Sequence, residues 1–206
     1  MKIGILTYHF AINYGAVLQC YALQQYLTSL GHDVEVINFI PQNYSRKRFW
    51  QNNNLRHDFV NGMSKLFLKL KYSSEMRKSF SGFVSSRFNL SESVDYTNFS
   101  DALNKYDAVI TGSDQVWGPS RWDDLCYFFD HMHNYRGRKI SYAPCCAINK
   151  AKNILKRNEI AVLLSEFYSL SVRNMETYNF VFDLIGKNVP IVSDPTLLYE
   201  FNELTD

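Results

Sequence analysis

The sequence lacks any apolar run close to the ~20 residues that a membrane-spanning helix needs. It also lacks a basic N-terminal region followed by an apolar stretch and a small-residue cleavage site, which a secretory signal would show. Internal repeats and low-complexity segments are absent as well. We therefore expect a cytoplasmic protein, with the inner membrane surface as an alternative location.

Cysteine is sparse, and none of the four cysteines forms the Cys-x-x-Cys pair that is typical of zinc sites. Cys20 falls within an apolar helical pattern, and the adjacent Cys145 and Cys146 are interpreted as small buried residues. His131 and His133 stand without a nearby cluster of carboxylates or thiolates, so we interpret them as loop residues. We expect no metal site.

Acidic residues are scarce between residues 42 and 90, where ten lysines and arginines face only Asp58 and Glu75. Two apolar stripes at helical spacing, at 59–70 and 76–84, predict a pair of amphipathic helices with basic outer faces. We expect these stripes to pack on the core. The alternative is weak contact of the basic faces with anionic lipid or a phosphorylated glycolipid.

The net charge of the whole chain is only +2, and no nucleic-acid fold signature is visible. These two observations argue against a nucleic-acid partner.

Strands and helices alternate along most of the chain. It opens with a strand at 2–7, a helix from about 16 to 30 and a strand at 33–38. Further strands are expected at 106–110, 138–143, 168–172 and 189–192, and helices at about 150–165 and 176–184. This order predicts an α/β fold with a parallel sheet and right-handed crossovers. With 206 residues, we expect one domain over 1–206 that carries a helical insertion at about 42–90.

Polar residues follow four of the expected strands. Because the carboxyl ends of parallel strands share one edge of a sheet, these residues should converge there and form a ligand site. The candidates are Asn13, Tyr14, Gly15, Gln19, Ser113, Asp114, Gln115, Trp117, Arg173 and Asp194.

The first of these segments precedes a helix start, where free N–H groups and the helix dipole suit a phosphate or carboxylate. Gly15 has no Cβ and would let the backbone approach a ligand closely. Asn13 is a favourable N-cap residue. The alternative interpretation is an ordinary capped turn between a strand and a helix.

The other candidates have chemical roles of their own. Asp114 could act as a general base or accept hydrogen bonds from sugar hydroxyls, with a turn residue as the alternative. Trp117 could stack on a sugar or belong to the core. Arg173 could bind a donor phosphate or carboxylate, or form a surface ion pair. Asp194 could bind substrate or shape a turn, and His9 could transfer protons or be structural.

Taken together, these motifs resemble the polysaccharide pyruvyl transferase family. The matching segments lie at 13–19, 21–23, 112–117, 140–143, 171–173 and 194–196, in family order. The resemblance implies Rossmann-like domains arranged as in GT-B glycosyltransferases. It also implies transfer of a pyruvyl group from phosphoenolpyruvate to a sugar of a cell-surface polysaccharide, which forms a cyclic ketal. The donor would be a substrate, no cofactor would be needed, and the acceptor would be a glycan or glycolipid.

The sequence departs from the family pattern in two places. Cys145, Cys146 and Ala147 stand where the family usually has a Ser-aromatic-Gly run. Family members also continue into a second domain that supplies much of the basic phosphoenolpyruvate pocket, whereas this sequence ends at Asp206. We therefore expect the N-terminal, acceptor-side half of a pyruvyl transferase. The sequence leaves three points open: whether the chain is active alone, whether it acts with a second chain, and whether it self-associates. A nucleotide-sugar-dependent glycosyltransferase and a non-enzymatic scaffold for glycan assembly remain alternatives.

Overall fold

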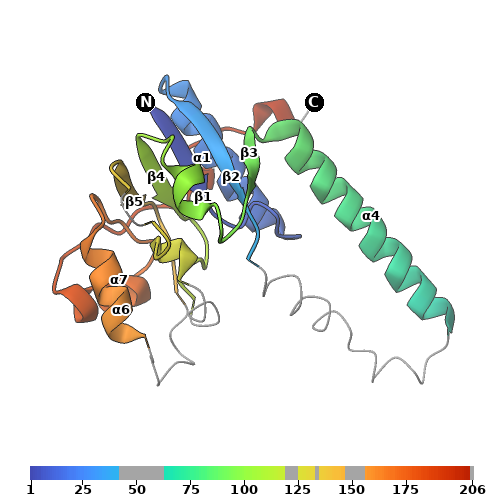
Figure 1. Cartoon of the computed structure of the whole chain (residues 1–206). Helices are drawn as coiled ribbons and strands as arrows, with labels where there is room; N and C mark the ends of the chain where they lie inside the picture. The colour runs from blue at the N-terminus through green and yellow to red at the C-terminus, as the bar shows by residue number, and fades with distance from the viewer. Residues whose placement is uncertain (42–62, 119–124, 133–134, 147–155, 205–206) are drawn as a thin grey trace.

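The fold is built on a five-stranded, all-parallel sheet in the order β3-β2-β1-β4-β5 (Figure 1). The computed structural model describes residues 1–41, 63–118, 125–132, 135–146 and 156–204. The strands are β1 (Lys2–Leu6), β2 (Asp33–Phe39), β3 (Leu90–Val94), β4 (Ala108–Thr111) and β5 (Arg138–Ser141). The sheet and its flanking helices confirm the α/β, Rossmann-like class.

The central strands are buried because helices and loops cover both faces of the sheet. In β1, Ile3 lies opposite Val34 of β2 on one side and Ala108 of β4 on the other. All four residues of β4 are buried. This burial explains why the central strands read as short, continuous apolar runs.

Helix α1 (Tyr14–Ser29) connects β1 to β2, and it begins two residues before the expected start. The side chain of Asn13 caps it by accepting a hydrogen bond from the backbone N–H of Ala16 at 3.0 Å. The later helices are α5 (Phe99–Leu103), α6 (Arg157–Ser165) and α7 (Met175–Ile185). Three short 3-10 helices are η2 (Cys126–Phe128), η4 (Pro195–Leu197) and η5 (Asn202–Leu204).

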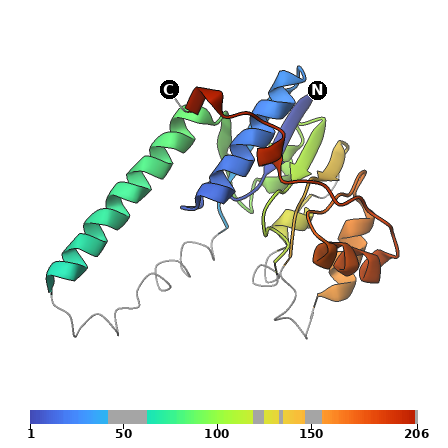
Figure 2. The same ribbon diagram turned by 180° about the vertical axis from the view of Figure 1, so that it is seen from behind.

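Helix α4 (Met63–Arg87) is one continuous helix, where the sequence predicted two. The first part of the expected insertion, at 42–62, lies outside the described residues. Figures 1 and 2 show α4 extending past the start of α1, so that the N-terminal end of α4 projects away from the sheet. Near its other end, Phe80 and Phe83 pack against Val17 and Tyr21 of α1. The prediction that the second stripe packs on the core is therefore confirmed.

Three expectations about strands need correction. Strand β3 was not predicted, because its sequence Leu-Ser-Glu-Ser-Val has little apolar character. The expected strands at 168–172 and 189–192 are reduced to isolated bridges, Ile140–Ser169 and Val172–Ile191.

Within the described part of the chain, no helix is both long enough and apolar enough to cross a membrane.

Candidate functional site

A pocket of about 520 Å³ lies beside the carboxyl ends of β1 and β4, and we call it the rim pocket. Its walls come from segments that are far apart in the sequence but meet at this edge of the sheet. They include six residues predicted for the site, together with Tyr8, Ala11, Ala16 and Thr196. The six predicted residues are Asn13, Gly15, Asp114, Gln115, Arg173 and Asp194.

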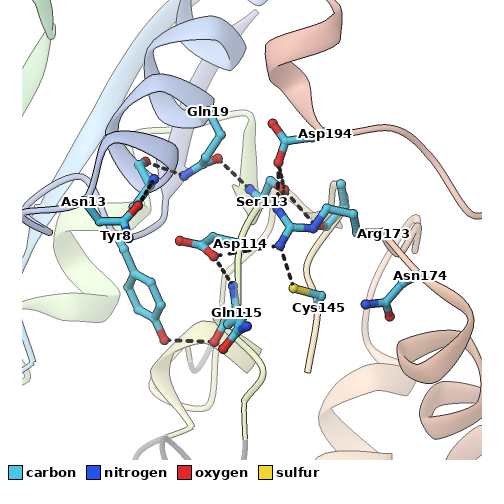
Figure 3. Close-up of polar contacts among 12 residues, drawn as sticks. Tyr8, Asn13, Gln19, Ser113, Asp114, Gln115, Cys145, Arg173, Asn174 and Asp194 are labelled. Carbon is cyan, nitrogen blue, oxygen red and sulfur yellow. Dashed lines mark hydrogen bonds and ion pairs between the residues drawn. The ribbon is translucent and has the colours of Figure 1, made fainter. Parts of the chain in front are cut away.

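Arg173 is the centre of the polar contacts in this pocket (Figure 3). Its Nη1 donates to Oδ2 of Asp194 at 2.6 Å, and its Nη2 lies 3.9 Å from Oδ1 of Asp114. Nη2 also donates to Sγ of Cys145 at 3.0 Å. Burial works to lower the pKa of Arg173, but Cys145 and Asp194 outweigh it and raise the pKa above its ordinary value. The guanidinium therefore stays charged and links segments from three parts of the chain.

Cys145 was expected to be buried, and it is, but its contact with Arg173 was not predicted. Burial raises the pKa of the Cys145 thiol, although the nearby Arg173 charge opposes that rise. The sulfur thus serves as an acceptor for one guanidinium N–H. Nothing local in the sequence marks this contact, because the two residues are 28 positions apart.

The loop after β4 holds Asp114 at the pocket. Gly112 has φ +105°, and a Cβ at this position would lie 2.3 Å from the carbonyl oxygen of Tyr142. The next peptide bond, between Gly112 and Ser113, is cis. Asp114 also has a positive φ, of 77°, and its Oδ1 accepts the backbone N–H of Gln115 at 2.7 Å. The loop conformation therefore directs the Asp114 carboxylate toward Arg173.

Gln19 and Ser113 support this loop from behind and do not line the pocket. The Oε1 of Gln19 accepts the backbone N–H of Ser113 at 3.1 Å, and its Nε2 donates to Oγ1 of Thr7 at 3.0 Å. Both side chains are essentially inaccessible to solvent. The structure therefore places these two predicted residues behind the rim pocket and not in its lining.

Trp117 also needs correction. Its side chain is fully buried and stacks on Phe128 with ring centroids 5.0 Å apart, while its Nε1 donates to the backbone oxygen of Tyr127 at 3.0 Å. No ring face is exposed for a sugar, so the core interpretation of Trp117 is the one that the structure supports.

His9 and Tyr14 lie outside the rim pocket. His9 is 1 % exposed, and its ring nitrogens lie 3.4 Å from the backbone oxygen of Thr7 and from Oδ1 of Asn38. Burial lowers the pKa of His9, which favours the neutral ring. Tyr14 is 72 % exposed, and its ring packs against Phe80 at 4.8 Å. The structure thus gives His9 a structural place and turns Tyr14 toward α4.

Two contributors to the pocket were missed in the sequence. The hydroxyl of Tyr8 donates to the backbone oxygen of Gln115 at 3.2 Å, which ties the loop after β1 to the loop after β4. Thr196 donates from its backbone N–H and its hydroxyl to Oδ1 of Asp194, at 3.0 and 2.8 Å. These bonds leave Oδ2 of Asp194 for Arg173. Among the described residues, no group of three or more His, Cys, Asp or Glu side chains gathers as metal ligands would.

Comparison with known proteins now adds to this geometry. None of the curated proteins compared with the chain matches it significantly. The family model described as polysaccharide pyruvyl transferase matches residues 13–205. This range includes every residue of the rim pocket except Tyr8 and Ala11. Because the match covers most of the sequence, the chain belongs to the polysaccharide pyruvyl transferase family.

Proposed function

We propose that the chain takes part in moving the pyruvyl group of phosphoenolpyruvate onto two hydroxyls of a sugar, and that the rim pocket holds this acceptor sugar. The charge of the rim pocket is the observation that supports its assignment to the acceptor sugar. Its ionised side chains are one guanidinium, Arg173, and two carboxylates, Asp114 and Asp194, which together give a net charge of −1. Carboxylates suit the hydroxyl donors of a sugar, whereas they repel an anionic donor.

The ion pair of Arg173 supports the same assignment. In the structure Nη1 of Arg173 donates to Asp194 at 2.6 Å and Nη2 donates to Cys145 at 3.0 Å, so the guanidinium is already engaged by groups of the protein. We therefore assign Arg173 to holding the two carboxylates in place, in preference to the donor-binding role expected from the sequence. The helix start at Asn13 and Gly15 borders the pocket and would offer backbone N–H groups to sugar oxygens or to the transferred carboxylate.

In the proposed reaction, the methylene carbon of phosphoenolpyruvate gains one proton and the former enol carbon forms a C–O bond to each sugar hydroxyl. The C–O bond to phosphate breaks, and the second hydroxyl proton leaves with the phosphate. We assign to Asp114 the acceptance of a proton from an attacking hydroxyl; its position in the pocket lining, with Oδ1 3.9 Å from Nη2 of Arg173, supports this role.

The test is Asp114→Asn in the full chain, with phosphate release and the mass of the sugar product as readouts. Loss of a general base lowers the turnover rate by about 100-fold or more. Asp183→Asn is the matched control, because Asp183 is exposed on α7 and does not line the rim pocket. Full turnover by Asp114→Asn, with the fold intact by circular dichroism, would remove Asp114 from the mechanism.

A binding experiment tests the acceptor assignment separately. Calorimetric titrations with a panel of methyl hexosides, and with phosphoenolpyruvate, would be made on the unmodified chain and on Arg173→Lys. We expect saturable binding of at least one hexoside that weakens in Arg173→Lys. Tight binding of phosphoenolpyruvate that is lost in Arg173→Lys would instead make the rim pocket a donor site.

A further inference from the structure

The side-chain amide of Gln19 closes a hydrogen-bond network behind the rim pocket, and we call it the Gln19 network. Its Oε1 accepts the backbone N–H of Ser113 at 3.1 Å (Figure 3), and its Nε2 donates to Oγ1 of Thr7 at 3.0 Å. The hydroxyl of Thr7 donates in turn to the backbone oxygen of Ser113 at 3.0 Å. Both backbone polar groups of Ser113 are therefore held by side chains from the start of the chain, and all three residues are buried.

The partners of Gln19 allow its amide only one orientation. Its Nε2 also donates to the backbone oxygen of Ala16 at 2.8 Å, and a carbonyl oxygen can only accept. The backbone N–H of Ser113 can only donate, so it must face Oε1. An apolar side chain of the same length would leave this buried N–H without an acceptor. The network thus depends on the chemistry of the amide and not on the volume of the side chain alone.

Asp114 follows Ser113 directly, and its backbone has to be held. Its φ of 77° is a conformation that residues with a Cβ rarely adopt, and such conformations persist where the surrounding contacts fix them. Its Oδ1 accepts the backbone N–H of Gln115 at 2.7 Å and lies 3.9 Å from Nη2 of Arg173. The direction of the carboxylate therefore follows from the backbone at Ser113, which the Gln19 network holds from behind.

We infer that Gln19 is a positioning residue for Asp114, and that the Gln19 network keeps the Asp114 carboxylate aimed at the acceptor hydroxyl. The inference rests on the proposed function, because Asp114 takes the hydroxyl proton in that reaction. Gln19 does not line the rim pocket, so its effect on the reaction passes through Asp114 and not through contact with the sugar. A displacement of a reacting group by about 1 Å can lower a rate by about 100-fold, so this support matters for turnover.

The first test is Gln19→Met in the full chain, with pyruvyl transfer as the assay. We expect kcat to fall by about 10- to 100-fold, while KM for the sugar changes by less than about threefold, because the pocket lining is unchanged. Gln24→Met is the matched control. Gln24 is also buried in α1, where its Nε2 donates to the backbone oxygen of Arg87 at 3.2 Å and its Oε1 accepts the N–H of Asn89 at 3.0 Å. It does not line the rim pocket, so its loss should lower stability and leave kcat within about twofold.

A double-mutant cycle separates positioning from a general loss of stability. In the Asp114→Asn background, Gln19→Met should lower the remaining rate by less than about twofold, because the group that it positions is already gone. Thr7 provides a second pair of variants that retains the volume of the buried side chain. Thr7→Val should lower kcat as Gln19→Met does, whereas Thr7→Ser keeps the hydroxyl and should restore it.

Amide hydrogen exchange, measured by NMR, tests the same inference without substrate. In Gln19→Met the backbone N–H groups of Ser113 and Gln115 should exchange at least about tenfold faster, with those of β1 unchanged, and Gln24→Met should leave all of them unchanged. Unchanged exchange at Ser113 and Gln115 would overturn the inference. So would equal losses of kcat in the two glutamine variants, or the same fall in rate with and without Asp114. If the unmodified chain transferred no pyruvyl group, the proposed function would fail by itself, and the exchange rates would still decide whether Gln19 positions Asp114.

Discussion

Replacing Gly112 by alanine should destabilise the protein more than replacing a glycine that has open space around it. Gly112 has φ +105°, a conformation that costs an L-residue about 1–2 kcal/mol. In addition, the new Cβ would lie 2.3 Å from the carbonyl oxygen of Tyr142 and 3.1 Å from the backbone nitrogen of Pro144. Both neighbours are backbone atoms, so the segment after β5 would have to move.

That movement would weaken two hydrogen bonds. One joins the backbone N–H of Tyr142 to the carbonyl oxygen of Thr111, and the other joins the hydroxyl of Ser113 to the carbonyl oxygen of Ala143. Each contributes about 1 kcal/mol. With the conformational cost, the expected loss in the free energy of unfolding is about 3–4 kcal/mol. For a domain of this size the corresponding fall in Tm is roughly 6–15 °C.

The assay is urea and thermal unfolding of a three-member series. Gly31→Ala measures the conformational cost alone, because Gly31 has φ +83° with nothing within 4 Å of an added Cβ. Gly82→Ala measures neither cost, because Gly82 lies in α4 with open space around it, and it should be neutral or stabilising by up to about 1 kcal/mol. If Gly112→Ala lost no more stability than Gly31→Ala, the reasoning about the backbone clash would be refuted.

Three further predictions follow from the other contacts. Burial raises the pKa of Glu35, but hydrogen bonds from Lys105, Tyr106 and Lys2 lower it to about 2, below its value in the unfolded chain. Glu35 therefore stabilises the fold above about pH 4.5, and this contribution is lost as the pH falls toward 2. Because both lysines are partly exposed, we expect Glu35→Gln to lower the free energy of unfolding by no more than about 2 kcal/mol at pH 7. Urea unfolding at pH 7 and pH 3 measures this loss. Cys145→Val should cost about 1–2 kcal/mol, because one N–H of Arg173 loses its acceptor, whereas Cys145→Ser should stay within about 0.5 kcal/mol; equal losses would argue against the thiol contact. Trp117→Ala should cost about 3–5 kcal/mol, since the ring is fully buried, and a loss below about 1 kcal/mol in the same unfolding assay would contradict its core position.

The sequence was most informative where local signals agree. The apolar strand at 2–7, the capping residue Asn13 and Gly31 after the helix together specify the opening of the fold, and the structure matches it to within two residues. The convergence of Asp114, Arg173 and Asp194 was also predictable, because β4 and the parallel bridges at Ser169 and Val172 bring the ends of these segments to one edge.

The remaining features depend on contacts that local patterns do not encode. Trp117 is buried because η2 folds over it and places Phe128 against its ring, an arrangement set by tertiary packing. The segment at 168–172 has the alternation of a strand, but beside β5 it forms an isolated bridge at Ser169 and a few backbone hydrogen bonds to Lys139 and Ser141, and no regular strand. Likewise, the contact between Cys145 and Arg173 arises from the crossing of two loops.

The last described segment has a consequence for the order in which the site can form. Asp194 reaches back 81 residues to Ser113, and Glu203 accepts a hydrogen bond from the hydroxyl of Tyr21, 182 residues earlier. During synthesis on the ribosome, β1, α1 and β4 would emerge well before these partners. Arg173 could therefore form its ion pair with Asp194 only after residue 194 had been synthesised. Contacts of such long sequence separation form late and slow folding. The rim pocket is thus completed only after the wall that contains Asp194 and Thr196 has been synthesised.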